Sequence, residues 1–137
     1  MSITISQAQG RPHVTVLAIR GDLDAKNFRE MIAKAGEAYK AGARCLLVDM
    51  SEMPFMSSSG LVALHSTILL FQGQQPPDPE HGWEALHAID RDLDCGIQTD
   101  VKLLNPQPRV RRTLEVTGME KFFEIYMERE AAIDSFG

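Results

Sequence analysis

The sequence is poor in cysteine and in long apolar runs. It holds only two cysteines, Cys45 and Cys95, among 137 residues. Two thiols cannot form the disulfide framework of a small secreted domain, so the composition favours a reducing cytoplasm. The longest mostly apolar stretch, 61–71, is interrupted by polar residues and is shorter than the ~20 residues that cross a bilayer. We therefore expect a cytoplasmic protein with no membrane insertion.

Positive charge is also scarce. Lys and Arg number 14 against 19 Asp and Glu, which leaves a formal net charge of −5. A protein that binds a phosphate backbone needs clustered Lys and Arg, and the short group Arg109, Arg111 and Arg112 does not reverse this balance. No nucleic-acid partner is expected. The start, 1–7, lacks the basic residues and the apolar core of a secretory signal.

Catalytic motifs are missing. Neither a Gly-x-Ser-x-Gly nucleophile turn nor a glycine-rich phosphate loop occurs. His65 follows Ser58 by seven residues on one expected helix, too far along it to act as the base for that serine. We expect no enzyme activity and no cofactor.

A cluster of metal-ligand residue types lacks the spacing of a metal site. Cys95 stands where a calcium loop needs glycine, and two histidines six residues apart do not share one helix face. No metal is therefore expected at the cluster, which consists of His81, His87, Asp90, Asp92, Asp94 and Cys95.

Strand-like and helix-like segments alternate along the chain. With 44% hydrophobic and 24% charged residues, the composition is that of an ordinary globular protein. Its length is typical of a single domain, 1–137. The alternation predicts an α/β fold, a mixed sheet with an N-terminal β-hairpin and with helices packed on it. Expected strands cover 3–5, 14–19, 45–48, 101–104 and 122–126, and expected helices cover 25–40 (with Asp24 as its N-cap), 57–71, 106–118 and 128–136.

The alternation fails from about 72 to 98, which we interpret as an insertion. Its first part, 72–79, is rich in Gln and Pro and cannot form a packed helix or a central strand. Farther on, four apolar residues recur every three to four positions, which predicts a short amphipathic helix. They are Trp83, Leu86, Ile89 and Leu93, and the role of the insertion is left open.

The least generic stretch is 48–61, in which a buried strand, a turn and an apolar pair lead into a serine-rich helix start. In α/β sheets, function gathers at the carboxyl ends of strands, here in the loops 21–24 and 49–59. One serine suffices to cap a helix, and three exceed that need. A helix N-terminus favours negative charge, so the fold would tolerate a phosphate there. That phosphate would add about −1.5 to −2 charges beside apolar residues, which suits a switch.

At these residues the sequence resembles the STAS family, the bacterial anti-sigma factor antagonists and their relatives. That family typically shows a strand ending in Asp-x-Ser and then Asp-Ser-Ser-Gly-Leu opening a helix. This chain has Asp49-Met50-Ser51 and then Ser57-Ser58-Ser59-Gly60-Leu61. The turn 21–24 and the ending 110–133 are similar to the family as well. The resemblance implies a STAS-like fold and a partner-switching regulator.

The resemblance also implies site residues and partners. The phosphoacceptor falls on Ser58, with Ser57 and Ser59 less favoured. The implied partners are an anti-sigma factor or serine-kinase protein, which binds the unmodified form, and a serine phosphatase, which resets it; a homodimer is left open. The implied partner-binding residues are Asp22, Asp24, Ser51, Met53, Pro54, Phe55, Met56, Gly60 and Leu61.

Ser57 stands where the family usually has aspartate, and this difference favours an alternative. In that alternative, the chain is a STAS module without phosphorylation that binds a small ligand or serves as a scaffold or transporter accessory subunit. The residues alone leave further points open. The serines suit a plain helix cap, Asp49 suits a carboxylate that closes a strand and binds loop amides, and the methionines suit either a binding face or the core.

Overall fold

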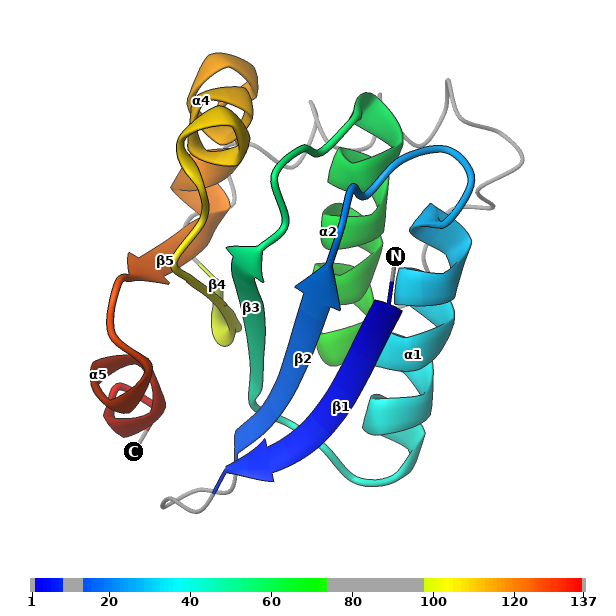
Figure 1. Cartoon of the computed structure of the whole chain (residues 1–137). Helices are drawn as coiled ribbons and strands as arrows, with labels where there is room; N and C mark the ends of the chain where they lie inside the picture. The colour runs from blue at the N-terminus through cyan, green and yellow to red at the C-terminus, as the bar shows by residue number, and fades with distance from the viewer. Residues whose placement is uncertain (1, 9–13, 74–97, 137) are drawn as a thin grey trace.

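The computed structural model describes residues 2–8, 14–73 and 98–136, and it shows a five-stranded sheet (Figure 1). The strands lie in the order β1-β2-β3-β4-β5; β1 is antiparallel to β2, and the other neighbours are parallel. The predicted mixed α/β fold with an N-terminal hairpin is confirmed.

The strands are β1 (Ser2–Ala8), β2 (Val14–Arg20), β3 (Leu46–Glu52), β4 (Gln98–Leu104) and β5 (Phe123–Tyr126). The helices are α1 (Phe28–Lys40), α2 (Ser58–Phe71), α4 (Pro108–Thr117), the 3₁₀ helix η1 (Met119–Phe122) and α5 (Arg129–Asp134).

The buried strand predicted at 45–48 lies in the middle of the sheet. Leu46, Leu47 and Val48 are each 0% exposed, so both faces of β3 are covered. The strand continues to Glu52, which pairs with Arg20 of β2, and therefore runs farther than predicted. The chain after this longer β3 stays in contact with the core, since Met53 and Met56 belong to the main core cluster.

Helices α1 and α2 cover one face of the sheet (Figure 1). They pack on each other through Tyr39 and Phe71, whose rings meet edge to face with centroids 5.5 Å apart. Residues on all sides of α2 are buried, including the polar residues His65, Ser66 and Thr67. Such an all-round buried helix is a rigid support for whatever its N-terminus carries.

The start of α1 corrects a prediction. The helix was expected to begin at Ala25 with Asp24 as N-cap, whereas it begins at Phe28 with Asn27 at the N-cap position. The Asp24 side chain instead accepts a hydrogen bond from the Lys26 amide (2.9 Å), and the backbone carbonyl of Asp24 accepts hydrogen bonds from the amides of Asn27 and Phe28. Asp24 therefore closes a turn before the helix, because an Asx turn competes with helix initiation.

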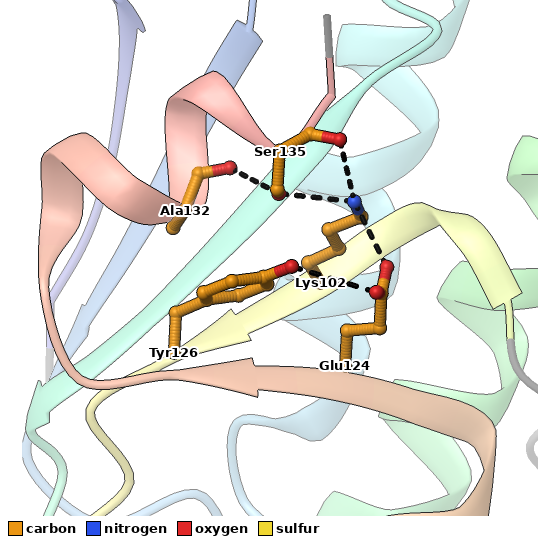
Figure 2. A network of polar contacts seen from close by, with 5 residues as sticks. All are labelled: Lys102, Glu124, Tyr126, Ala132 and Ser135. Atoms are coloured by element: carbon orange, nitrogen blue, oxygen red, sulfur yellow. Dashed lines mark hydrogen bonds and ion pairs between the residues drawn. The ribbon is translucent and has the colours of Figure 1, made fainter.

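Helix α5 packs on the opposite face of the sheet from α1 and α2. Its Ala132 lies in a small cluster with Leu47 and Leu104, which alternate along their strands with the residues of the main core. The centre of this contact is Lys102 of β4, 3% exposed. Its ammonium lies 2.9 Å from the Glu124 carboxylate and 3.1 Å and 3.0 Å from the carbonyl and hydroxyl oxygens of Ser135 (Figure 2).

The C-terminal elements otherwise agree with expectation. Helix α4 begins at Pro108, two residues later than expected, and is followed by Gly118 as its C-cap, whose φ of 79° is the left-handed conformation that glycine adopts readily. The 3₁₀ helix η1 was not predicted. Most of the insertion at 72–98, its expected short helix and the six metal-ligand candidates lie outside the described residues. Within the described ranges, no group of His, Cys, Asp and Glu side chains could hold a metal ion, and no helix is long and apolar enough to cross a bilayer.

Candidate functional site

Two loops that the sequence singled out meet at the carboxyl ends of β2 and β3. Leu23, in the turn 21–24, forms a parallel bridge with Met56. The Leu23 amide donates to the Phe55 carbonyl (3.0 Å), and the Ser57 amide donates to the Leu23 carbonyl (2.9 Å). These bonds fix the loop 53–57, called the β3–α2 loop below, against the turn after β2.

Apolar side chains fill the space beneath the β3–α2 loop. Leu23, Met53 and Met56 are 0–1% exposed, and Leu61 is 5% exposed. A methyl group on Gly60 would overlap Met56 Cγ and would lie 3.2 Å from Leu23 Cδ2, so only glycine fits there without displacement. Met53, Met56, Gly60 and Leu61, which were expected to contact a partner, are buried in this structure and support the loop from below.

The residues left at the surface define a smaller patch. Asp22, Pro54 and Ser58 are exposed, while Asp24 and Phe55 are partly buried. A partner that approaches this end of the sheet meets these side chains first. The fully exposed part of the expected site is therefore one carboxylate, one proline and one serine.

The three serines occupy the first turn of α2. Ser57 is the N-cap residue with extended backbone, Ser58 is the first helical residue, and Ser59 follows it. No side-chain hydrogen bond caps the helix, and its first turn contains no acidic residue. The hydroxyl oxygen of Ser57 is buried without a hydrogen-bond partner, the one such side-chain atom in the described ranges. The positive end of α2 is thus not neutralised from within the first turn, and the exposed Ser58 lies on it.

Ser51, expected to contact a partner, belongs to a partly buried cluster of polar side chains. Asp49 accepts the Ser51 amide (3.0 Å) and hydroxyl (2.6 Å). Both residues lie within β3, so the Asp49 carboxylate binds an amide of its own strand, not a loop amide after the strand has ended. Asn105 donates to the Ser51 hydroxyl (3.3 Å), and Gln107 donates to its carbonyl (2.7 Å). The cluster ties the ends of β3 and β4 to the start of α4.

Asn105 and Gln107 were missed by the sequence reading. Asn105 has φ of 51°, a left-handed conformation that asparagine tolerates better than most residues. The signal was available in the Asn105-Pro106 pair directly after an expected strand, at the same sheet edge as Asp49.

A hollow separates the β3–α2 loop from α4, and the sequence analysis did not anticipate it. Its volume is about 330 Å³. The guanidinium carbon of Arg109 lies 5.2 Å from the centre of the Phe55 ring, so loop and helix are in contact. This hollow, called the α4 groove, is lined by Phe55, Arg109, Arg112, Thr113, Val116 and Thr117.

A second hollow, of about 760 Å³, lies where α1 ends and β3 begins, and its lining includes the partly buried free cysteine Cys45. Burial raises the pKa of this thiol, Asp100 raises it further, and Lys102 opposes them. Because thiolate is the nucleophile, a raised pKa makes the group less reactive at neutral pH. The hollow is lined by Ile5, Gln7, Thr15, Glu37, Ala38, Ala41, Gly42, Ala43, Arg44 and Cys45.

We expect iodoacetamide to modify Cys45 several-fold more slowly in the folded protein than in urea-unfolded protein at pH 8. The pH midpoint of the reaction should lie above that of the unfolded chain, since the folded state raises the pKa of the thiol. The measurement needs a Cys95→Ser background, so that a single thiol is followed by mass spectrometry. Equal rates in both states would contradict the burial argument.

The comparisons with known proteins agree with this fold. A family model described as STAS domain matches residues 6–75. The chain therefore belongs to the STAS domain family, and the resemblance found in the sequence is confirmed. Comparison with curated protein sequences finds no significant match.

Solved structures share the whole fold at low sequence identity. An anti-sigma factor antagonist from Mycobacterium paratuberculosis is 21% identical over 96% of this chain and 91% of that one, with a TM-score of 0.64. A putative anti-sigma factor antagonist from Thermotoga maritima is 14% identical over 93% and 90%, with a TM-score of 0.66. The anti-sigma factor antagonist SpoIIAA in its unphosphorylated form is 19% identical over 93% and 92%, with a TM-score of 0.61. The likeness extends beyond residues 6–75 to nearly the full chain.

Proposed function

We propose that this STAS domain is a partner-switching regulator of the anti-sigma factor antagonist type. Its unmodified form binds an anti-sigma factor or serine-kinase protein, phosphorylation of Ser58 releases that partner, and a serine phosphatase restores the first state. The protein works in the cytoplasm without catalysis of its own. Residues 1–137 act as one domain that carries an insertion at about 72–98.

The observation that carries the proposal is the position of Ser58. It is exposed on the first turn of α2, whose N-terminus carries no acidic residue and no side-chain cap. Backbone amides at such an end bind phosphate well, so the fold would accept the modification. The neighbouring Pro54 and Phe55 offer apolar surface to a partner, and desolvating a phosphate beside it would be costly.

The structural neighbours support the same proposal. SpoIIAA, whose fold this chain shares, is solved in its unphosphorylated form and, for the Bacillus protein, in its phosphorylated form. The TM-scores to this chain are 0.61 and 0.58, respectively. A single fold therefore accommodates both states in that protein.

The proposal is tested by incubating the protein with its cognate anti-sigma kinase and ATP, followed by peptide mass spectrometry. We expect one phosphate on Ser58. The Ser58→Ala variant should not be modified, whereas Ser57→Ala and Ser59→Ala, the matched controls on either side, should be. Ser58→Asp should weaken binding to the kinase by about tenfold, equivalent to ~1.4 kcal/mol. Absence of phosphate on all three serines, together with unchanged binding by Ser58→Asp, would contradict the switch.

The alternative function, a STAS module without phosphorylation, has one observation in its favour. Ser57 replaces the family's usual aspartate, and its buried hydroxyl oxygen has no partner. Such a group is costly to leave unpaired, so a bound small ligand or an accessory role in a larger assembly would give it one. Under this alternative, Ser57→Ala weakens ligand or scaffold binding while the serines stay unmodified.

A further inference from the structure

The α4 groove combines apolar surface with positive charge. Val116 is 75% exposed, although it is a β-branched apolar residue on a helix that buries Val110 and Leu114. Across the groove, the partly buried Phe55 ring forms the facing wall. Single exposed apolar residues are ordinary on protein surfaces. Here the exposed valine shares a hollow with an aromatic ring, which makes it a candidate binding surface.

The charge of the groove is opposite to that of the whole protein. Arg109 and Arg112 are exposed, and in the described part of the chain no carboxylate pairs with either of them. Arg111, between them, is instead paired with Glu115 at 3.5 Å. Among the residues that the structure describes, the groove lining includes no Asp or Glu. In a chain of net charge −5, this is a local positive patch that attracts negative charge.

The groove residues on α4 form one continuous stripe. Arg109, Arg112, Thr113 and Val116 are spaced i, i+3, i+4 and i+7, so they share one helix face. The stripe lies beside the β3–α2 loop, because Arg109 stacks on Phe55. An extended segment that runs along this face would meet the two guanidinium groups, with Phe55 beside the first of them, and then the apolar side chain of Val116.

We propose that the α4 groove binds an acidic segment of a protein partner that also carries an aliphatic side chain. The aliphatic group inserts between Phe55 and Val116, and carboxylates pair with Arg109 and Arg112. Guanidinium groups favour this partner because they form paired hydrogen bonds with carboxylates. The inference rests on the proposed function only for the identity of the partner, since the groove and its charge do not depend on phosphorylation of Ser58.

The test uses synthetic peptides and the full chain, followed by NMR titration of backbone amides without kinase or ATP. The probe is a peptide in which leucine alternates with glutamate and aspartate. We expect its binding to shift the amides of α4 and Phe55 and to weaken as salt is added. A peptide with serine in place of leucine and a peptide with lysine in place of the acidic residues should both bind at least about fivefold more weakly.

Matched variants locate the binding. Binding of the acidic peptide should be about fivefold weaker in each of the variants Arg109→Gln, Arg112→Gln and Val116→Ser. Because the three residues are exposed, the substitutions should leave the midpoint of thermal unfolding unchanged. Arg111→Gln removes the same charge from the same helix, and Met127→Ser changes another exposed apolar residue, 57% exposed; both should retain binding.

The proposal is overturned by shifts on another face, by equal losses in Arg111→Gln, or by equal binding of the lysine peptide. It is also overturned if the protein alone self-associates in a manner that Arg109→Gln and Arg112→Gln abolish, since the occupant would then be a second copy. A failed phosphorylation test at Ser58 would leave the peptide result standing, so failure of this proposal is distinguishable from failure of the proposed function.

Discussion

Replacement of Gly60 by alanine is expected to lower the free energy of unfolding by about 1–3 kcal/mol, the usual cost of inserting a methylene into a filled core. The new methyl group would overlap Met56 Cγ and crowd the Leu23 side chain at 3.2 Å. Met56 is 1% exposed and Leu23 is 0% exposed, so neither can turn toward solvent without opening a gap. Urea denaturation measures the change in the free energy of unfolding. An unchanged m-value would show that the variant and the wild type expose the same amount of surface on unfolding.

A second glycine provides the matched control. Gly36 also lies within a helix, α1, but the nearest described atom to a methyl group there would be Leu70 Cδ1 at 4.0 Å. Gly36→Ala should therefore raise the free energy of unfolding by about 0.4–1 kcal/mol, because alanine favours the helix and restricts the unfolded chain. The opposite signs of the two substitutions separate crowding from helix propensity.

The Gly60 substitution should also disturb the proposed switch. The bridge between Leu23 and Met56 holds the β3–α2 loop, so displacing Met56 shifts Phe55 and the start of α2. Met56→Ala makes space for the methyl group. The double variant should therefore lose less free energy of unfolding than the two single variants lose in sum. Gly60→Ala as stable as the wild type, or strict additivity with Met56→Ala, would contradict the crowding argument.

The alternation of segments was sufficient to predict the fold. Each strand is recognised by a short apolar run and each helix by a recurring apolar face. Both features can be found in the sequence without knowing which segments pack together. Element ends were less predictable, because they depend on pairing. β3 extends to Glu52 since Arg20 lies beside it, and α1 starts late since Asp24 and Asn27 bind the backbone of the turn first.

The serine-rich helix start was visible in the sequence, whereas the orientation of its neighbours was not. Methionine is equally suited to a core and to an adaptable surface, and only the folded structure shows that Met53 and Met56 are buried, at 0% and 1% exposed. The α4 groove was missed for a different reason. Net charge is a sum over the chain, and it does not report that Arg109 lies beside Phe55, which is more than fifty residues earlier in the sequence.

Lys102 was also beyond sequence reasoning. It lies within the run Val101-Lys102-Leu103-Leu104, which predicts a strand correctly but says nothing of where the charge goes. Its partners are Glu124 on the next strand and Ser135 at the end of α5. A buried charge requires such partners, but their identity follows from the tertiary structure.

The second large effect is expected at this lysine. Glu124→Ala should lower the free energy of unfolding by about 3–5 kcal/mol, because it leaves a buried ammonium group without its counter-charge. Lys102→Met should lower the free energy of unfolding by less than Glu124→Ala does. It keeps an unbranched side chain against Phe136, whose ring centre lies 4.6 Å from the ammonium, and it leaves a carboxylate that is 37% exposed and can be hydrated. The order of the two variants is the test, measured by urea denaturation.

The same variants should loosen α5 selectively. Lys102 connects β4 to the last turn of that helix through Ser135, whose hydroxyl in turn donates to the Ala132 carbonyl at 2.6 Å (Figure 2). Without this connection, we expect hydrogen exchange to rise first in α5 amides, while those of α2 stay protected, because a short terminal helix opens at lower free energy than the core.

A surface ion pair controls for charge removal in general. Lys34 and Glu37 lie 3.9 Å apart on α1 with side chains 38% and 68% exposed. Lys34→Met should change the free energy of unfolding by less than about 0.5 kcal/mol, since exposed pairs contribute little. If Glu124→Ala were equally mild, or if Lys102→Met proved the more damaging of the two, the network would hold α5 by apolar packing rather than by its charge. Protection of α5 amides in both variants would exclude any anchoring role for Lys102.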